Sequence, residues 1–323
     1  MRYYIAFDGG GSKLQGILFD ETGRVLNTGL SGGINSNVHS LDAVQQHVED
    51  CVAQLFAGLE NPPAEIEGII SSQYTSEYRT VVERYAPCRD LLGGGEGLLG
   101  VLACGVTNGL CALAGTGSDV FLIRNGKNVD TIGGWGYLLG DDGSGVWIGV
   151  HAARELARAT GGMVPKSLMT DMLEEAFQIH SSGDLIREVY GRKESPAFYL
   201  GSFCKVVQQA AELGDATAIR ILRESGEALA KQAELLIEKH NLGSTLPMCL
   251  TGSVLRHCRA MREGFSAYLR KRYPELKIIR PKFEPVVGAV ILGLLHSGKT
   301  LDEALLEMLS ESCKVFRIDA ADV

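Results

Sequence analysis

Two stretches of the chain share one pattern of short apolar runs separated by glycine-rich or polar turns. The apolar runs are residues 3–7, 14–19 and 25–29 in the first stretch, and residues 110–114, 119–123 and 128–132 in the second. In each stretch a glycine-rich loop, at 8–13 or 115–118, separates the first two runs. Short β-rich runs broken by Asn-Gly or Asp-x-x-Gly turns indicate hairpins. The pattern therefore predicts a duplicated α/β fold in which each half opens with a three-stranded meander beside a common cleft.

Apolar residues at a three-four spacing predict helices in most of the remaining chain. Ser40 can cap a helix that starts at Leu41, and residues 214–241 form a long predicted helix that Gly243 stops. Other helices are expected at about 145–160, 196–212, 253–272, 286–297 and 301–310, and strands at 68–71, 248–251 and 277–280. We predict an N-terminal domain at 1–114 and a second domain at 115–297. A C-terminal helix at about 298–323 is expected to pack back on the first domain.

Composition narrows the class of protein. A chain of 323 residues with 45% hydrophobic and 22% charged residues suits two globular domains. The net charge of −8 disfavours nucleic-acid binding, which needs a cationic face. No apolar run approaches 18 residues, and the first run is too short for a signal peptide, so we expect no membrane partner. The eight cysteines are scattered without a C-x-x-C pair, as is typical of reduced thiols in a cytoplasmic protein.

The first glycine-rich loop, Asp8-Gly9-Gly10-Gly11-Ser12-Lys13, lies between two predicted strands. The usual P-loop and the Rossmann fingerprint both lead into a helix, so neither fits. Glycines let backbone N–H groups approach a phosphate closely, Ser12 or Lys13 can add a donor, and Asp8 can hold Mg²⁺ through water. The alternative is a tight hairpin turn with a solvated lysine.

The second loop, Gly115-Thr116-Gly117-Ser118, has the same place in the second half. Two such loops that face each other across a cleft can hold the phosphates of one nucleotide between them. A third stretch at 133–149 carries both tryptophans, and Asp141 and Asp142 precede a predicted helix there. The alternative for Asp142 and Ser144 is helix capping alone.

The Gly-Thr-Gly-Ser loop, followed at this spacing by GGWGYLLGDDGSGVWIG, resembles the N-acetylglucosamine kinase branch of the BadF/BadG/BcrA/BcrD ATPase family. That family belongs to the actin/hexokinase/Hsp70 fold group. The resemblance implies duplicated ribonuclease H-like (actin-like ATPase) domains, with ATP and Mg²⁺ as cofactors. Residues 250–254 resemble the family's adenosine-contacting strand and turn, and residues 287–289 its Gly-Ala helix start.

The resemblance also assigns roles to individual residues. The implied ATP-binding residues are Gly9, Gly10, Gly11, Ser12, Lys13, Gly115, Thr116, Gly117, Ser118, Gly252 and Ser253. The implied acceptor-binding residues are Asn37, Gly134, Trp135 and Asp141. Asp8 and Asp141 are implied to organise Mg²⁺ and to take part in catalysis. His39 is interpreted as a packing or surface residue.

The chain departs from the family pattern where the catalytic aspartate is expected, about twenty residues before the second loop. Residues 93–100 offer Glu96 as their one carboxylate, which we interpret as the base, although a structural or surface charge is the alternative. Residues 71–75 also differ, because relatives usually have a glycine-rich stretch there.

The resulting hypothesis is an ATP-dependent kinase that phosphorylates a hydroxyl of a small amino sugar such as N-acetylglucosamine or glucosamine. One alternative is an ATPase switch that acts on a partner. Some relatives of this kind carry an iron–sulfur cluster between subunits, and Cys104 and Cys111 are the nearest candidates for its ligands. Another is a sugar sensor without catalysis. A homodimer is expected from the resemblance alone.

Overall fold

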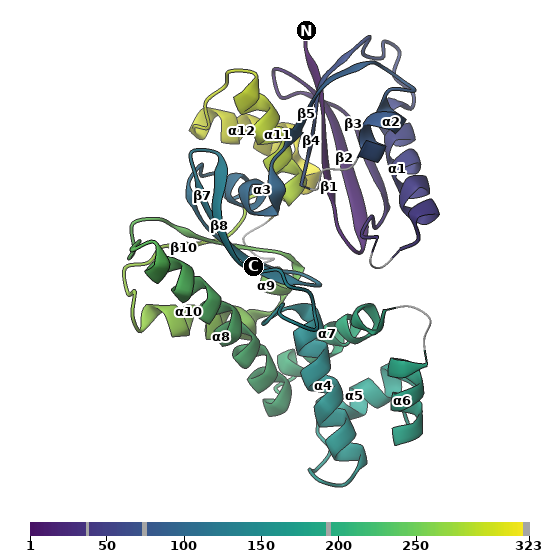
Figure 1. The fold of residues 1–323 in the computed structure, drawn as a ribbon, viewed down its shortest axis with the longest axis vertical. Helices are drawn as coiled ribbons and strands as arrows, with labels where there is room; N and C mark the ends of the chain where they lie inside the picture. The colour runs from purple at the N-terminus through teal and green to yellow at the C-terminus, as the bar shows by residue number, and fades with distance from the viewer. Residues whose placement is uncertain (37–38, 73–75, 192–194, 319–323) are drawn as a thin grey trace. The chain divides into compact units, whose positions relative to one another are not determined.

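The computed structural model describes residues 1–36, 39–72, 76–191 and 195–318, and these form two compact units (Figure 1). Over the described residues, unit 1 contains 1–109, 123–129 and 280–318. Unit 2 contains 110–122 and 130–279. The domain limits predicted from the sequence stay a prediction.

Unit 1 is built on a five-stranded sheet with the order β3-β2-β1-β4-β5. Its strands are β1 (Tyr3–Gly9), β2 (Lys13–Asp20), β3 (Val25–Gly32), β4 (Ile66–Ser71) and β5 (Cys88–Gly93). β1, β2 and β3 form the predicted antiparallel meander, while β4 and β5 run parallel to β1. The carboxyl ends of the three parallel strands therefore meet at one edge of the sheet.

Successive residues of β1 point to opposite faces of this sheet, because side chains alternate along a strand. Ile5 and Phe7 lie in a core with α1 (Leu41–Phe56) and α2 (Ser76–Val82). On the other face α11 (Pro285–His296) packs against β1, β4 and α3 (Gly95–Ala103). Figure 1 shows α1 and α2 on one side of the sheet and α11 and α12 (Glu303–Ser312) on the other. Both faces are covered, which explains the nearly continuous apolar runs of these strands.

Unit 2 repeats the plan with a sheet of order β10-β9-β6-β7-β8. Its strands are β6 (Gly109–Ala114), β7 (Ser118–Arg124), β8 (Lys127–Gly133), β9 (Met248–Thr251) and β10 (Ile278–Ile279). β9 runs parallel to β6, as β4 runs parallel to β1. In both units the strand of the meander that comes first in the chain is central. The predicted duplicated α/β fold is therefore confirmed.

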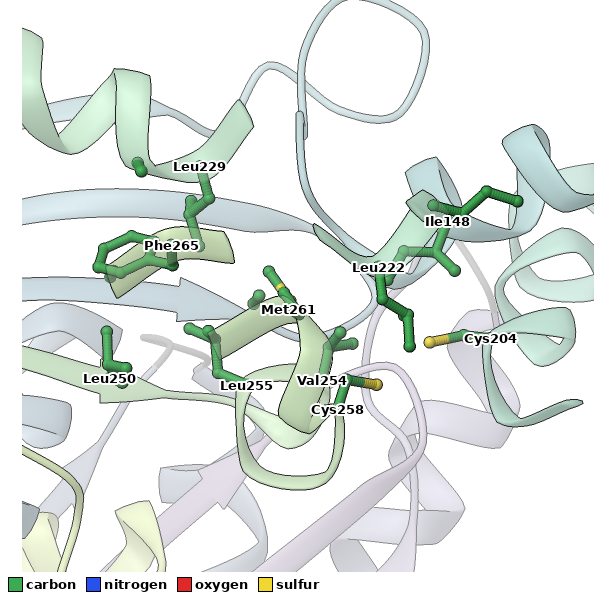
Figure 2. Close-up of a cluster of buried hydrophobic side chains, with 14 of the residues drawn as sticks. Ile148, Cys204, Leu222, Leu229, Leu250, Val254, Leu255, Cys258, Met261 and Phe265 are labelled. Atoms are coloured by element: carbon green, nitrogen blue, oxygen red, sulfur yellow. The ribbon is translucent and has the colours of Figure 1, made fainter. Parts of the chain in front are cut away.

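The other regular elements that the structure describes in unit 2 are helices. They are α4 (Gly145–Thr160), α5 (Leu168–Phe177), α6 (Ser182–Tyr190), α7 (Pro196–Glu212), α8 (Ala216–Lys239), α9 (Ser253–His257) and α10 (Arg259–Arg270). Figure 2 shows Leu222 and Leu229 of α8 in one apolar cluster with Met261 and Phe265 of α10. α8 and α10 pack closely at Gly226, where a Cβ would lie 2.1 Å from a main-chain oxygen of α10. Glycine at this position therefore permits the close approach of the two helices.

The structure corrects two predicted helices and confirms others. Helix 253–272 is instead two helices, because the backbone at Cys258 is extended (φ −88°, ψ 92°). The predicted long helix 214–241 agrees with α8 within two residues at each end. The predicted helix 145–160 agrees with α4 at both ends. In place of one C-terminal helix, the described residues contain α12 and a 3₁₀ turn at Lys314–Phe316.

Candidate functional site

Three parallel strands of unit 1 bring polar residues to one edge of the sheet. In the strand register Phe7 lies opposite Ser71, and Ser71 lies opposite Gly93. Asp8, Ser72 and Glu96 follow these positions at the ends of β1, β4 and β5, so the sheet gathers them. The carboxyl ends of parallel strands are the usual place for a ligand in α/β proteins.

Asp8 is electrostatically strained at this edge. Burial, and next the nearby Glu96, raise the pKa of the Asp8 carboxyl to about 6, although the Ser72 hydroxyl and Lys13 lower it. Lys13 relieves the strain only in part, because its ammonium nitrogen lies 2.9 Å from the Glu284 carboxylate. Asp8 is half-buried, and its carboxylate is raised in energy by partial burial and by the nearby Glu96, an arrangement that favours a bound cation. The residues present therefore fit Mg²⁺ at Asp8.

The first loop has room for a phosphate. A Cβ added at Gly10 would meet no atom within 4 Å among the contacts that the structure describes, so the space above this residue is open. The Gly10 carbonyl accepts a hydrogen bond from the Ile34 N–H (2.8 Å), and the Gly11 carbonyl accepts one from His39 Nε2 (2.8 Å). Both carbonyls are thereby occupied on the side of the loop that faces Ile34 and His39.

The second loop is held by the first turn of α4. The N–H of Gly145 donates to the Gly115 carbonyl at 2.8 Å, and the N–H of Val146 donates to the Thr116 carbonyl at 3.4 Å. A Cβ added at Gly115 would also meet no described atom within 4 Å. Each loop therefore has one glycine that faces open space.

Asp141 lies over the second loop. It is 8% exposed and takes a left-handed backbone conformation (φ 56°). Its carboxylate accepts hydrogen bonds from the N–H groups of Ser118 and Gly136, yet burial still raises its pKa. A Cβ added at Gly117 would lie 3.0 Å from the Asp141 carboxylate. Two predicted site elements, the second loop and Asp141, are thus in contact within unit 2.

Asp119 is a candidate site residue that the sequence reasoning missed. Its carboxylate oxygen lies 2.2 Å from the position that a Cβ would take on Gly134, which is itself a predicted acceptor contact. Burial and then Asp141 raise the pKa of Asp119 to about 6. The available signal was its place directly after the second loop, at the start of the otherwise apolar run Asp119–Ile123.

Gly252 and Ser253 lie at the same sheet edge as the second loop, because β9 pairs in parallel with β6. Gly252 has φ +92°, and a Cβ there would lie 2.2 Å from the Ala114 carbonyl. Only glycine fits this conformation and this close approach. Ser253 begins α9 directly after it.

The remaining predicted residues have different surroundings. Ser144 caps α4 by accepting a hydrogen bond from the Trp147 N–H (3.1 Å). The main-chain carbonyl of Asp142 accepts one from the Ser118 hydroxyl (2.9 Å). Trp135 is 74% exposed. Asn37 lies outside the described residues.

Predicted site residues therefore fall into two groups, each described within its own unit. Unit 1 holds Asp8, loop 9–13 and Glu96, and unit 2 holds loop 115–118, Gly134, Trp135, Asp141, Gly252 and Ser253. Within the described parts of the chain, no group of three or more His, Cys, Asp and Glu side chains could hold a metal on protein ligands alone.

Both candidate cluster ligands of the ATPase-switch alternative lie in the protein interior. Cys104 and Cys111 are 4% and 0% exposed, which disfavours an iron–sulfur cluster shared with a second subunit. None of the helices in the described segments is long and apolar enough to cross a membrane.

Comparisons with known proteins agree over almost the whole chain. A curated relative, the N-acetylmuramic acid/N-acetylglucosamine kinase of Clostridium acetobutylicum, is 26% identical, covering 91% of this chain and 98% of the relative. The N-acetyl-D-glucosamine kinase of Dictyostelium discoideum is 25% identical, covering 90% and 97%. The solved structure of a candidate N-acetylglucosamine kinase from Chromobacterium violaceum matches with a TM-score of 0.69 and 26% identity, covering 90% and 99%.

The family model for BadF/BadG/BcrA/BcrD ATPases matches residues 7–293. This range contains both glycine-rich loops, the carboxylates beside them and the strand that leads to Gly252. The resemblance predicted from the two loops and the stretch after them is confirmed: this chain belongs to the BadF/BadG/BcrA/BcrD ATPase family.

Proposed function

We propose that this protein is an ATP-dependent kinase that transfers the γ-phosphoryl group of ATP to a hydroxyl of an amino sugar, such as N-acetylglucosamine or glucosamine. Family membership supports the use of ATP. Relatives that match almost end to end, and whose names state an amino-sugar kinase activity, support the acceptor class. The observation that carries the proposal is the electrostatic influence of Glu96 on Asp8, which raises the pKa of that carboxyl, beside an open glycine-rich loop.

The nucleotide's phosphates are assigned to the two loops. Residues 9–13 and 115–118 each offer backbone N–H groups, and the space above Gly10 and Gly115 admits a phosphate oxygen. Gly252 and Ser253 are assigned to the adenosine, because they follow the strand that pairs with β6. Lys13 is held by Glu284, so a direct role on the phosphate requires that this ion pair open.

Glu96 is assigned as the general base. It lies in the first turn of α3, where the helix dipole favours a carboxylate. It would accept the proton of the attacking hydroxyl on a carboxylate oxygen as the new O–P bond forms and the bond from the γ-phosphorus to the departing ADP breaks. The glutamate side chain is one methylene longer than that of the aspartate expected at this place. The preceding residue, Gly95, has a left-handed backbone conformation (φ +66°). Gly134, Trp135, Asp141 and the predicted contact Asn37 are assigned to the acceptor, with Asp119 added beside Gly134.

Mg²⁺ is assigned to Asp8, with Asp141 as the second candidate. When bound, the ion supplies charge neutralisation for the phosphates, which dominates catalysis of phosphoryl transfer. Asp8 contributes a carboxylate whose repulsion from Glu96 a cation relieves. The predicted cytoplasmic location and homodimer stay predictions.

The test is ADP release from MgATP by the purified protein, with and without N-acetylglucosamine, glucosamine and N-acetylmuramic acid. We expect one amino sugar to stimulate turnover and Glu96→Gln to reduce it by about 10²–10⁴-fold, the range for general bases. Glu60→Gln is the matched control, since Glu60 is exposed in the same unit. Glu96→Asp measures the contribution of the extra methylene.

Each contrary result leads to a defined alternative. Turnover that no sugar changes supports the ATPase switch, and sugar binding without turnover supports the sensor. Full activity of Glu96→Gln would remove Glu96 as the base while leaving the kinase assignment in place.

A further inference from the structure

Two histidines brace the first glycine-rich loop from its outer side. His39 Nε2 lies 2.8 Å from the Gly11 carbonyl oxygen. His47 Nδ1, on α1, lies 2.7 Å from the Gly33 carbonyl oxygen. The two imidazole rings meet edge to face with centroids 5.5 Å apart. The loop is therefore tied to α1 through a chain of side-chain contacts.

The direction of these hydrogen bonds is fixed by chemistry. A carbonyl oxygen only accepts, so His39 carries a proton on Nε2 and His47 carries one on Nδ1. In a trans peptide the carbonyl and the N–H of the next residue point in opposite directions, and the described chain has no cis peptide bond. A Gly11 carbonyl held toward His39 therefore turns the Ser12 N–H to the opposite side of the loop.

The preceding peptide is oriented in the same way. The Gly10 carbonyl accepts a hydrogen bond from the Ile34 N–H at 2.8 Å, which turns the Gly11 N–H away from Ile34. Two successive N–H groups are thus presented on the side opposite to the brace. Successive backbone N–H groups of this kind form an anion-binding nest.

Packing leaves the brace little freedom. A Cβ on Gly33 would lie 2.3 Å from the Gly11 oxygen and 2.7 Å from His39 Nε2. A Cβ on Gly32 would lie 2.4 Å from the His47 ring. The chain at the end of β3 is therefore packed directly against the loop. The position of the Gly11 carbonyl depends on both His39 and Gly33.

We infer that His39 is a positioning residue for phosphate binding. It fixes the Gly11–Ser12 peptide so that the Ser12 N–H points to the phosphates of a nucleoside di- or triphosphate, beside the Gly11 N–H that the Ile34 hydrogen bond orients. The inference rests on the proposed function only for the class of ligand, and it does not depend on a sugar acceptor. His39 itself touches the loop and not the ligand.

The test is equilibrium binding of MgADP and of adenosine, with no sugar and no turnover. His39→Phe keeps a ring but removes the donor, so the Kd for MgADP should rise about three- to tenfold, the equivalent of one hydrogen bond. The Kd for adenosine should stay unchanged, because adenosine has no phosphate. His39→Gln, whose amide nitrogen can replace Nε2, should restore MgADP binding to near the wild-type value.

The controls separate positioning from folding. His180→Phe is the matched control, because His180 is exposed and lies in unit 2. If His39→Phe fails to fold, His39→Asn serves in its place, since its amide is too short to reach the Gly11 carbonyl. Gly33→Ala displaces the same carbonyl from the other side. It should also weaken the binding of MgADP while leaving the binding of adenosine unchanged.

Two outcomes would overturn the inference. One is unchanged MgADP binding by folded His39→Phe or His39→Asn, and the other is an equal loss of MgADP and adenosine binding. Wild-type protein that binds MgADP no better than adenosine would also overturn it. Failure of every sugar to stimulate turnover would count against the proposed acceptor but not against this role of His39.

Discussion

The two glycine-rich loops have the same place in two copies of one topology but are held by different means. In unit 1 the loop after β1 is braced by the His39 ring and by the Ile34 N–H. In unit 2 the loop after β6 is held by the first turn of α4 and by the Asp141 carboxylate. The repeated topology thus specifies where a loop stands, while its neighbours specify how it is held.

The charges beside the loops also differ. Unit 1 pairs Asp8 with Glu96 and has Lys13 close by, bound to Glu284. In unit 2 Asp141 raises the pKa of Asp119, and among the described residues no basic group contributes to the shifted pKa of either carboxyl. In the assignments proposed above, unit 1 carries the base and the first Mg²⁺ candidate, and unit 2 carries the described acceptor contacts and the second Mg²⁺ candidate.

The largest expected effect comes from Asp8→Asn, which tests the unit 1 side. We expect kcat to fall by about 10²–10³-fold, as when an electrostatic group at a reacting centre is lost. Removal of this half-buried charge should at the same time raise the free energy of unfolding at pH 8 by about 1–2 kcal/mol. Turnover assays and thermal melts measure the two effects. A variant that loses stability together with activity would contradict the assignment.

The next effect compares the open glycines of the two loops. Gly10→Ala and Gly115→Ala should each lower kcat/KM for ATP by about 10²-fold, because a methyl group displaces a phosphate from its position. Neither should lower the melting temperature, since both methyl groups enter open space. Gly252→Ala is the contrast, because its Cβ would lie 2.2 Å from a carbonyl oxygen and should destabilise the fold. Equal melting temperatures for all three variants would show that this distinction is wrong.

A smaller effect is expected at Asp119. Asp119→Asn should raise KM for the amino sugar about tenfold, the equivalent of one charged hydrogen bond, and leave MgADP binding unchanged. Steady-state kinetics with sugar as the varied substrate measure the first value and calorimetry the second. Asp184→Asn is the control, since Asp184 lies on α6 and pairs with Arg187. A change in MgADP affinity instead would move Asp119 to the nucleotide side.

The smallest effect is a dependence of stability on pH. Asp8 and Asp119 have folded pKa values of about 6, above the ordinary value of 3.8, so the folded state binds their protons more tightly. Their contribution is present in full below pH 4 and is lost as the pH rises through 6. Stability should therefore fall by about 1–2 kcal/mol from pH 5 to 7.5. Asp130, with a pKa lowered to about 2, acts oppositely but only below pH 4.

Denaturant melts at several pH values measure this slope. The double variant Asp8→Asn, Asp119→Asn should flatten it, and a wild-type slope in that variant would assign the dependence to other groups.

Strong local patterns allowed much of the fold to be predicted. The predictions of both meanders and of α4 were correct, because their apolar runs are bounded by glycine or by a capping residue. β5 and α3 were not predicted, because residues 88–103 mix glycines with apolar residues at no clear period. Glu96 was nevertheless found, since a carboxylate among glycines is conspicuous. Asp119 was not, because its significance depends on Gly134 and Asp141, which are distant in sequence.

The sequence by itself determined the duplicated meanders, the two glycine-rich loops and the family, since each rests on residues that are neighbours in the chain. Only the tertiary structure decided which groups share an environment. It brought Asp8 to Glu96, Asp119 to Asp141 and His39 to the Gly11 carbonyl. Strand pairing and helix packing create these contacts between distant residues, and burial then sets their charge. Local patterns predict where a loop forms, but its chemistry depends on partners that only folding supplies.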